Sequence, residues 1–118
     1  MTRRHDNRCH DFDIDRKTTK AIELLFKRNK VPIDITGWTI YFTVKSKMED
    51  SDSSALIQKD ITSHLDPKNG KSLITLDPSD TDRRGSFNYD IKYKDLSDNT
   101  GILYYGRIRF RETVTTRG

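Results

Sequence analysis

Short runs in which apolar and polar residues alternate strictly set the fold class of this chain. Within 38–45, Trp38, Ile40, Phe42 and Val44 fall on one side, and the residues between them fall on the other. A period of two gives a strand one apolar and one polar face, whereas a helix needs apolar residues three or four positions apart. The pattern therefore predicts strands that bury a single face.

Seven runs of this kind are separated by turn signals such as Asn69-Gly70, a pair that favours tight hairpins. Thirteen Thr, eleven Ile and three Val stand against two Ala, and this balance also favours strands over helices. We expect strands at 11–15, 21–27, 38–45, 55–61, 72–76, 87–94 and 104–111, with the longest loop at 46–54. Seven short strands, each with one apolar face, predict an all-β fold, an antiparallel β-sandwich.

The length of 118 residues fits one domain with a small core. Residues 1–10 show no apolar periodicity, so we expect a flexible basic arm there and a sandwich domain at 11–118. Cys9 is the single cysteine, and no internal disulfide can form. No apolar run is long enough for a membrane span or a secretory signal, so we expect a soluble chain that stays where it is made.

The apolar faces of the strands define the expected core. Trp38 is in register with its apolar neighbours, so we expect it to be a core residue and not a platform for a ligand. Gly106 interrupts a long strand, which predicts a bulge or a close approach of another backbone. The expected core consists of Ile22, Leu24, Phe26, Trp38, Ile40, Phe42, Val44, Ile74, Leu76, Phe87, Tyr89, Ile91, Ile108 and Phe110.

The net charge of +4 comes from the two ends of the chain. Residues 1–10 hold three Arg and one Asp, and residues 101–118 hold four Arg and one Glu. Residues 11–100 hold 15 basic and 16 acidic side chains, so the body is close to neutral. This distribution argues against nucleic acid as the partner, because such a chain usually carries its basic residues along a face of the body.

Three arginines alternate in the last expected strand, Arg107, Arg109 and Arg111, and we call them the arginine stripe. Alternation puts all three on one sheet face, about 7 Å apart along the strand. A solvated outer face that resists edge-to-edge aggregation is one interpretation. Contacts to carboxylates of a neighbouring subunit, or to phosphates, are the others.

Candidate catalytic and metal-binding residues lack the patterns that such sites need. His5, Cys9 and His10 offer three potential ligands, but a structural zinc site needs a fourth at fixed spacing. His64 has no paired Ser or Cys motif, so we expect a loop residue. The six Gly form no phosphate-binding loop. We therefore expect no enzyme activity, no catalytic residue, no metal and no cofactor.

Five motifs follow one another along the chain: DFDIDR at 11–16, VPIDITGWTI at 31–40, DPSDT at 77–81, FNYDI at 87–91 and GRIRF at 106–110. In this order they resemble small immunoglobulin-like domains of tailed-phage virion proteins. That family has a polar loop, then a Pro-Ile-Asp-Leu-Thr-Gly turn and an alternating strand. The resemblance covers about residues 11–115, and the basic arm and the arginine stripe depart from it. The most similar members are the N-terminal domains of upper baseplate proteins and small tail or fibre-associated proteins.

The resemblance implies an immunoglobulin-like sandwich that is a non-enzymatic building block in the tail, baseplate or fibre region of a phage or prophage particle. We expect it in the virion, assembled in the cytoplasm of the host bacterium, bound to other virion proteins and to copies of itself, without a membrane or a small-molecule substrate. A capsid-surface decoration protein and a nucleic-acid-binding or carbohydrate-binding sandwich are the alternatives. The expected contact residues are Arg3, Arg4, Arg8, Tyr105, Arg107, Arg109 and Arg111.

Overall fold

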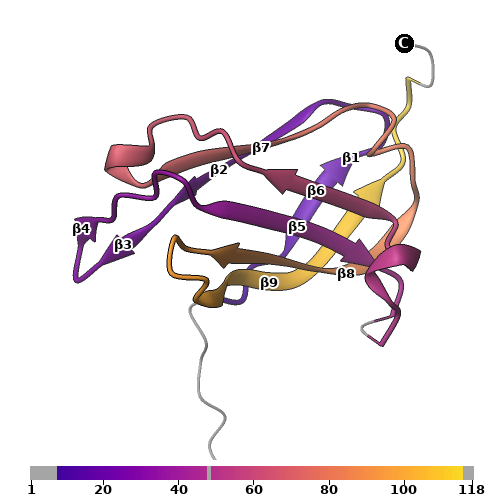
Figure 1. Cartoon of the computed structure of the whole chain (residues 1–118). Coiled ribbons are helices and arrows are strands. Elements are labelled where there is room, and N and C mark those ends of the chain that lie inside the picture. The colour runs from indigo at the N-terminus through magenta and orange to yellow at the C-terminus, as the bar shows by residue number, and fades with distance from the viewer. Residues whose placement is uncertain (1–7, 48, 116–118) are drawn as a thin grey trace, which may run out of the picture.

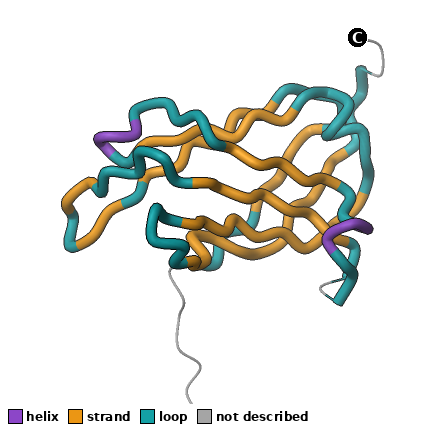
Figure 2. Tube along the Cα trace, viewed as in Figure 1, coloured by secondary structure: helices purple, strands orange, loops and turns teal. Residues whose placement is uncertain are grey.

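Strands form nearly all the regular structure of the chain (Figures 1 and 2). The computed structural model describes residues 8–47 and 49–115, and none of its segments is a helix that could cross a membrane. Two short elements, η1 (Asp52–Ser54) and η2 (Pro67–Asn69), are single 3₁₀ turns. The strands are β1 (Phe12–Asp15), β2 (Lys20–Leu25), β3 (Lys27–Arg28), β4 (Val31–Pro32), β5 (Thr39–Lys45), β6 (Ile57–Ile61), β7 (Lys71–Leu76), β8 (Gly85–Lys94) and β9 (Thr100–Arg111).

Two sheets enclose the core, and all seven predicted strands are present. One sheet has five strands in the order β1-β9-β8-β5-β6, and the other pairs β2 with β7. β3 and β4 form a separate hairpin, which the sequence reading did not predict. β2, β5 and β7 bury alternate residues; in β5, Ile40, Phe42 and Val44 are buried while the side chains between them are partly exposed. The alternation in the sequence is therefore the alternation of the two sheet faces.

The expected antiparallel arrangement is wrong at one pair of strands. β1 runs parallel to β9, with Phe12 opposite Ile108 and Asp15 opposite Arg111. All other pairs of long strands are antiparallel. A hairpin turn forces antiparallel pairing on the strands that it joins, but no hairpin joins β1 to β9, so local turn signals do not fix their direction.

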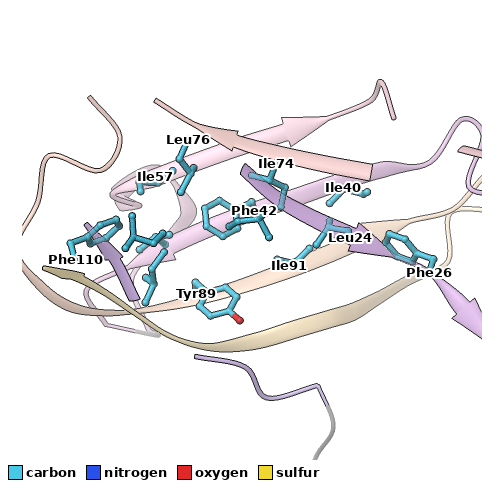
Figure 3. Close-up of a cluster of buried hydrophobic side chains, with 14 of the residues drawn as sticks. Leu24, Phe26, Ile40, Phe42, Ile57, Ile74, Leu76, Tyr89, Ile91 and Phe110 are labelled. Atoms are coloured by element: carbon cyan, nitrogen blue, oxygen red, sulfur yellow. The ribbon is translucent and has the colours of Figure 1, made fainter. Parts of the chain in front are cut away.

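The core fills the space between the two sheets (Figure 3). Twelve of the fourteen expected core residues are buried, while Trp38 and Phe87 are partly buried and pack against the cluster. Trp38 caps one end of the core, where its ring stacks on Tyr93 at 5.3 Å between centroids. Ile14, Ile35 and Ile57 are also fully or almost fully buried and complete the core.

The hairpin of β3 and β4 extends from the end of the sandwich that also holds η2 (Figure 1). Its base is fixed by hydrogen bonds from the Phe26 amide to the Gly70 carbonyl at 2.8 Å and from the Ile33 amide to the Phe26 carbonyl at 3.0 Å. Asn29 and Lys30 form its tip with φ angles of 51° and 67°. A two-residue turn that matches the right-handed twist of its strands needs a positive φ angle at both positions. The turn and the hydrogen bonds at the base therefore give the hairpin a defined structure.

Candidate binding surfaces

The arginine stripe lies opposite carboxylates of its own chain. In the ladder between β1 and β9, Asp13 faces Arg109 and Asp15 faces Arg111. Arg109 Nε donates to Asp13 Oδ1 at 3.1 Å, and Arg111 Nη2 donates to Asp15 Oδ1 at 3.0 Å. The four side chains are about half exposed, between 49% and 54%. The carboxylates that we expected from a neighbouring subunit therefore come from the first strand, and a subunit contact by these arginines stays a prediction.

Arg107 and Tyr105 are also held by neighbours in the same chain. The Arg107 amide donates to Asp11 Oδ1 at 2.9 Å, and its guanidinium donates to Asn88 Oδ1 and to the Ser86 carbonyl at 3.3 Å each. The guanidinium carbon of Arg8 lies 5.9 Å from the centre of the Tyr105 ring, within the range of cation–π contacts. The stripe and its surroundings are thus a set of internal contacts. Arg3 and Arg4 lie outside the described residues.

Residues 8–10, the described part of the expected arm, pair with β9, while residues 1–7 of that arm lie outside the described residues. The Tyr105 amide donates to the Arg8 carbonyl at 3.0 Å, and the His10 amide donates to the Tyr105 carbonyl at 2.9 Å. The buried Tyr89 hydroxyl donates to the His10 carbonyl. Burial raises the pKa of Tyr89 strongly, because the phenolate would lose its hydration. Backbone pairing needs no apolar periodicity, and for this reason the sequence pattern missed it.

Gly106 confirms the predicted close approach of another backbone. A Cβ atom at this position would meet the His10 carbonyl oxygen and would lie 2.7 Å from Asp11 Oδ1. A methyl group would therefore separate residues 10 and 11 from β9. The glycine allows the first described residues to lie flat against the last strand.

An ion-pair network joins the ends of β1 and β9. Arg16 donates to Asp82 and to Glu112, at 2.9 Å in both cases. Arg84 reaches the second carboxylate oxygen of Glu112 at 2.5 Å. The hydrogen bond from Arg16 is the main reason that the pKa of Glu112 lies below its ordinary value. The network continues the charge pairing of the arginine stripe past the last strand.

His64 is a structural residue and not only the loop residue that we expected. Its Nδ1 lies 2.9 Å from Ser72 Oγ, and its Nε2 lies 2.8 Å from the Trp38 carbonyl. Ser72 is fully buried, so no substrate reaches its hydroxyl. The histidine therefore connects β7 to the start of β5. Among the described residues, no three His, Cys, Asp or Glu side chains gather as a metal site would require.

The outer face of the five-stranded sheet is hollowed over about 950 Å³. Asp90 lies at its centre, between Thr43 of β5 and Tyr105 of β9 in the strand register. Burial raises the pKa of the Asp90 carboxyl, and no hydrogen bond or ion pair links this carboxylate to another described residue. Tyr41 and Lys92 lie in the next row of the sheet. We call this surface the outer hollow. It presents both positively and negatively charged groups that can form hydrogen bonds.

The hairpin of β3 and β4 carries a second group of cations, Lys27, Arg28 and Lys30, and we call residues 27–32 the basic hairpin. All three cations are exposed. Within 8–47 and 49–115, none of them has an ion pair or a side-chain hydrogen bond. Lys30 adopts a left-handed backbone, which costs a residue with a Cβ about 1 kcal/mol. The sequence reading missed this surface, although the run Lys-Arg-Asn-Lys is visible in the sequence.

Comparison with known proteins places the fold. No protein-family model and no curated protein sequence matches this chain. Among solved structures, it is similar to the N-terminal domain of ORF48 of phage TP901-1, with a TM-score of 0.51 and 11% identity, over 87% of this chain and 84% of that one. It is also similar to a structure from a photo-crosslinking study of cell-adhesive interactions of VGSC beta subunits, with a TM-score of 0.50 and 9% identity, over 98% and 100% of the two chains.

The chain is an all-β immunoglobulin-like sandwich. Murine CRIg is a weaker match, whose TM-score of 0.46 does not by itself support the fold, at 15% identity over 86% of this chain and 92% of that one. The sheet order resembles that of variable-type immunoglobulin domains, in which two further strands extend the sheet formed by the third and the last two strands of the sandwich. Here β6 is such a further strand, beside β5, β8 and β9. At sequence identities of 9% and 11%, the likeness to the phage domain and to the structure from the photo-crosslinking study shows the fold alone.

Proposed function

We propose that this chain is a non-enzymatic assembly module of a bacteriophage or prophage particle. The observation that carries the proposal is the likeness of its fold to the N-terminal domain of a phage protein, over 87% of this chain. The order of the turn and strand motifs in the sequence supports the same origin. In this role the sandwich binds other virion proteins, and copies of itself, in the tail, baseplate or fibre region.

The chemistry of the described residues favours binding over catalysis. The single Ser–His hydrogen bond among them is closed to substrates, because Ser72 is fully buried. The half-buried Asp90 has no second acid or base bonded to it that would transfer a proton. The exposed surfaces offer charged groups and hydrogen bonds instead. A protein that works by contact needs only such surfaces.

Carbohydrate binding is the second candidate function, and the outer hollow is the observation that favours it. The hollow presents two partly exposed phenol rings, Tyr41 and Tyr105, on either side of the unpaired Asp90 carboxylate. Rings that pack on sugar faces and carboxylates that accept from sugar hydroxyls suit such a ligand. If this candidate is right, a glycan array finds a bound sugar, and replacing both tyrosines by Ala abolishes the binding.

The assembly role is tested on particles released by bacteria that carry the gene. The particles are purified on a density gradient, and their proteins are identified and counted by mass spectrometry. We expect the chain in a fixed copy number per particle, retained after a wash in high salt. An abundant enzyme of the host cytoplasm serves as the control for contamination. A chain that is made in the cells and absent from the particles would contradict the proposal, and placement on the head would favour a capsid decoration protein.

A further inference from the structure

We propose that the basic hairpin and the surface around its base form a docking site for an acidic protein that is different from this chain. The inference rests on the assembly role proposed above, because it names the surface and the partner chemistry of that role. The hairpin extends from one end of the sandwich, away from the arginine stripe (Figure 1). The features that a partner would contact are the exposed cations of the hairpin and the exposed apolar residues beside them.

The cations of the hairpin are available to a partner. Lys27, Arg28 and Lys30 are exposed, and no described carboxylate pairs with them. Two acids are nearest along the chain. Glu23 lies in β2, and Asp34 is used in a turn, where its Oδ1 accepts from the Thr36 amide at 2.9 Å and from the Thr36 hydroxyl at 2.6 Å. Unpaired cations on a fixed hairpin form a site for an anionic surface, because the backbone that holds them loses little conformational entropy when a partner binds.

Exposed apolar side chains gather at the same end. Of the five large hydrophobic residues that are exposed in the described chain, four lie here, with exposed fractions of 39% for Leu25, 62% for Val31, 60% for Leu65 and 75% for Leu96. Leu25 directly precedes the hairpin base, and Val31 lies within the hairpin.

Two contacts place the other two leucines near that base. Leu65 precedes Asp66, which bridges to Lys71 opposite Leu25. Leu96 packs over Gly37, two residues after Ile35, whose amide donates to the Pro67 carbonyl of η2 at 2.9 Å. The four apolar residues therefore lie on segments that are in the hairpin, join its base or contact the residues next to it.

This combination favours a protein over a nucleic acid. Surfaces that bind phosphates are polar and strongly positive, whereas protein interfaces have apolar centres with a charged rim. A second copy of this chain is a poor occupant, because the chain has a net charge of +4 and the carboxylates of β1 are already paired with arginines. The partner that fits is an acidic protein surface with apolar or aromatic residues within it.

The test compares three probes at physiological salt: a random copolymer of glutamate and tyrosine, a glutamate homopolymer, and a short DNA duplex of mixed sequence. The wild-type chain should bind the copolymer more tightly than it binds a glutamate homopolymer or the duplex. The triple variant K27A/R28A/K30A should bind the copolymer at least about tenfold more weakly. V31S/L96S should reduce the advantage of the copolymer over the homopolymer. Circular dichroism and thermal unfolding verify that each variant is folded.

Two matched variants separate the hairpin from net charge. K27R/R28K/K30R keeps the charges and should retain the binding, while R107A/R109A/R111A removes the same number of charges from the stripe and should weaken it by less than about threefold. Equal losses in the two triple Ala variants, or a greater loss in the stripe variant, would overturn the proposal. Tighter binding of the duplex that K27A/R28A/K30A abolishes would overturn it in favour of a nucleic acid.

The same variants separate this inference from the assembly role. In purified particles, K27A/R28A/K30A should be strongly depleted relative to the wild-type chain expressed in the same cells. A variant that enters particles normally and binds the copolymer normally would disprove the docking site and leave the assembly role intact. A wild-type chain that is absent from particles, with hairpin-dependent binding preserved, would disprove the assembly role and leave the surface.

Discussion

The arginine stripe and the basic hairpin each carry three cations, but they differ in what lies across from them. Arg109 and Arg111 face Asp13 and Asp15 in the neighbouring strand at 3.1 Å and 3.0 Å. The cations of the hairpin face solvent, because its two short strands pair only with each other. The number of charges in a segment thus says little about which of them a partner can reach. The pairing of the strands decides this.

The largest expected effect comes from separating β1 from β9 with Gly106→Val. The added side chain would collide with the His10 carbonyl and with Asp11, so we expect the free energy of unfolding to fall by about 2 to 4 kcal/mol. Denaturant unfolding measures the change. Thr75→Val, at an exposed position of β7, is the control and should stay within about 0.5 kcal/mol. An unchanged midpoint in Gly106→Val would mean that the close approach does not hold the two strands together.

A smaller loss of stability is expected when residues 1–10 are removed. The buried Tyr89 hydroxyl and the backbone of Tyr105 lose their hydrogen-bond partners, which should cost about 1 to 3 kcal/mol. Removing residues 1–7 leaves all these bonds in place and should change the stability by less than about 0.5 kcal/mol. Thermal unfolding of the two deletions distinguishes them. If both melt like the full chain, residues 8–10 contribute nothing to the sheet.

The double variant D13N/D15N should leave the cations of the arginine stripe unpaired, as those of the basic hairpin are. It removes the carboxylates that neutralise Arg109 and Arg111, so binding to the glutamate–tyrosine copolymer should increase severalfold. Stability should change by less than about 1 kcal/mol, because both pairs are half exposed. D60N/D77N changes the net charge equally, away from the stripe, and serves as the control. Equal gains in both double variants would show that net charge alone governs the binding.

Lys30→Gly should separate stability from binding at the tip of the hairpin. Glycine adopts the observed φ of 67° without steric cost, so we expect the free energy of unfolding to rise by about 0.5 to 1 kcal/mol. The loss of one cation should weaken copolymer binding by about twofold to threefold. Calorimetry of the free chain and a binding titration measure the two effects. A variant that loses stability would show that the tip is not strained.

The fold was predictable from the sequence because its main signal is local. Alternation of apolar and polar residues is a property of each strand alone, so Ile40, Phe42 and Val44 point inward whatever their neighbours are. The direction of β1 was not predictable in this way, because it depends on a strand about 96 residues further along the chain. The partners of the arginine stripe follow from that direction.

The candidate surfaces were predictable only in part. The stripe was visible as an alternation, but its neutralisation required the register between β1 and β9. The basic hairpin was missed because charges were summed over 11–100, a segment whose acids and bases nearly cancel. A count over four residues would have found Lys27, Arg28 and Lys30 beside the turn residue Asn29. The contact between His64 and Ser72 depends on tertiary packing and left no local signal.

The parallel ladder of β1 and β9 also determines how the sandwich responds to mechanical force. Phe12 begins β1 opposite Ile108, and the two strands run in the same direction to Asp15 and Arg111. A pull applied before Phe12 and after Arg111 therefore slides one strand along the other and loads their hydrogen bonds and the Asp–Arg pairs simultaneously. Antiparallel neighbours pulled from one end would open one bond at a time. The first and last strands thus form a shear geometry, in which the bonds of the ladder must break together.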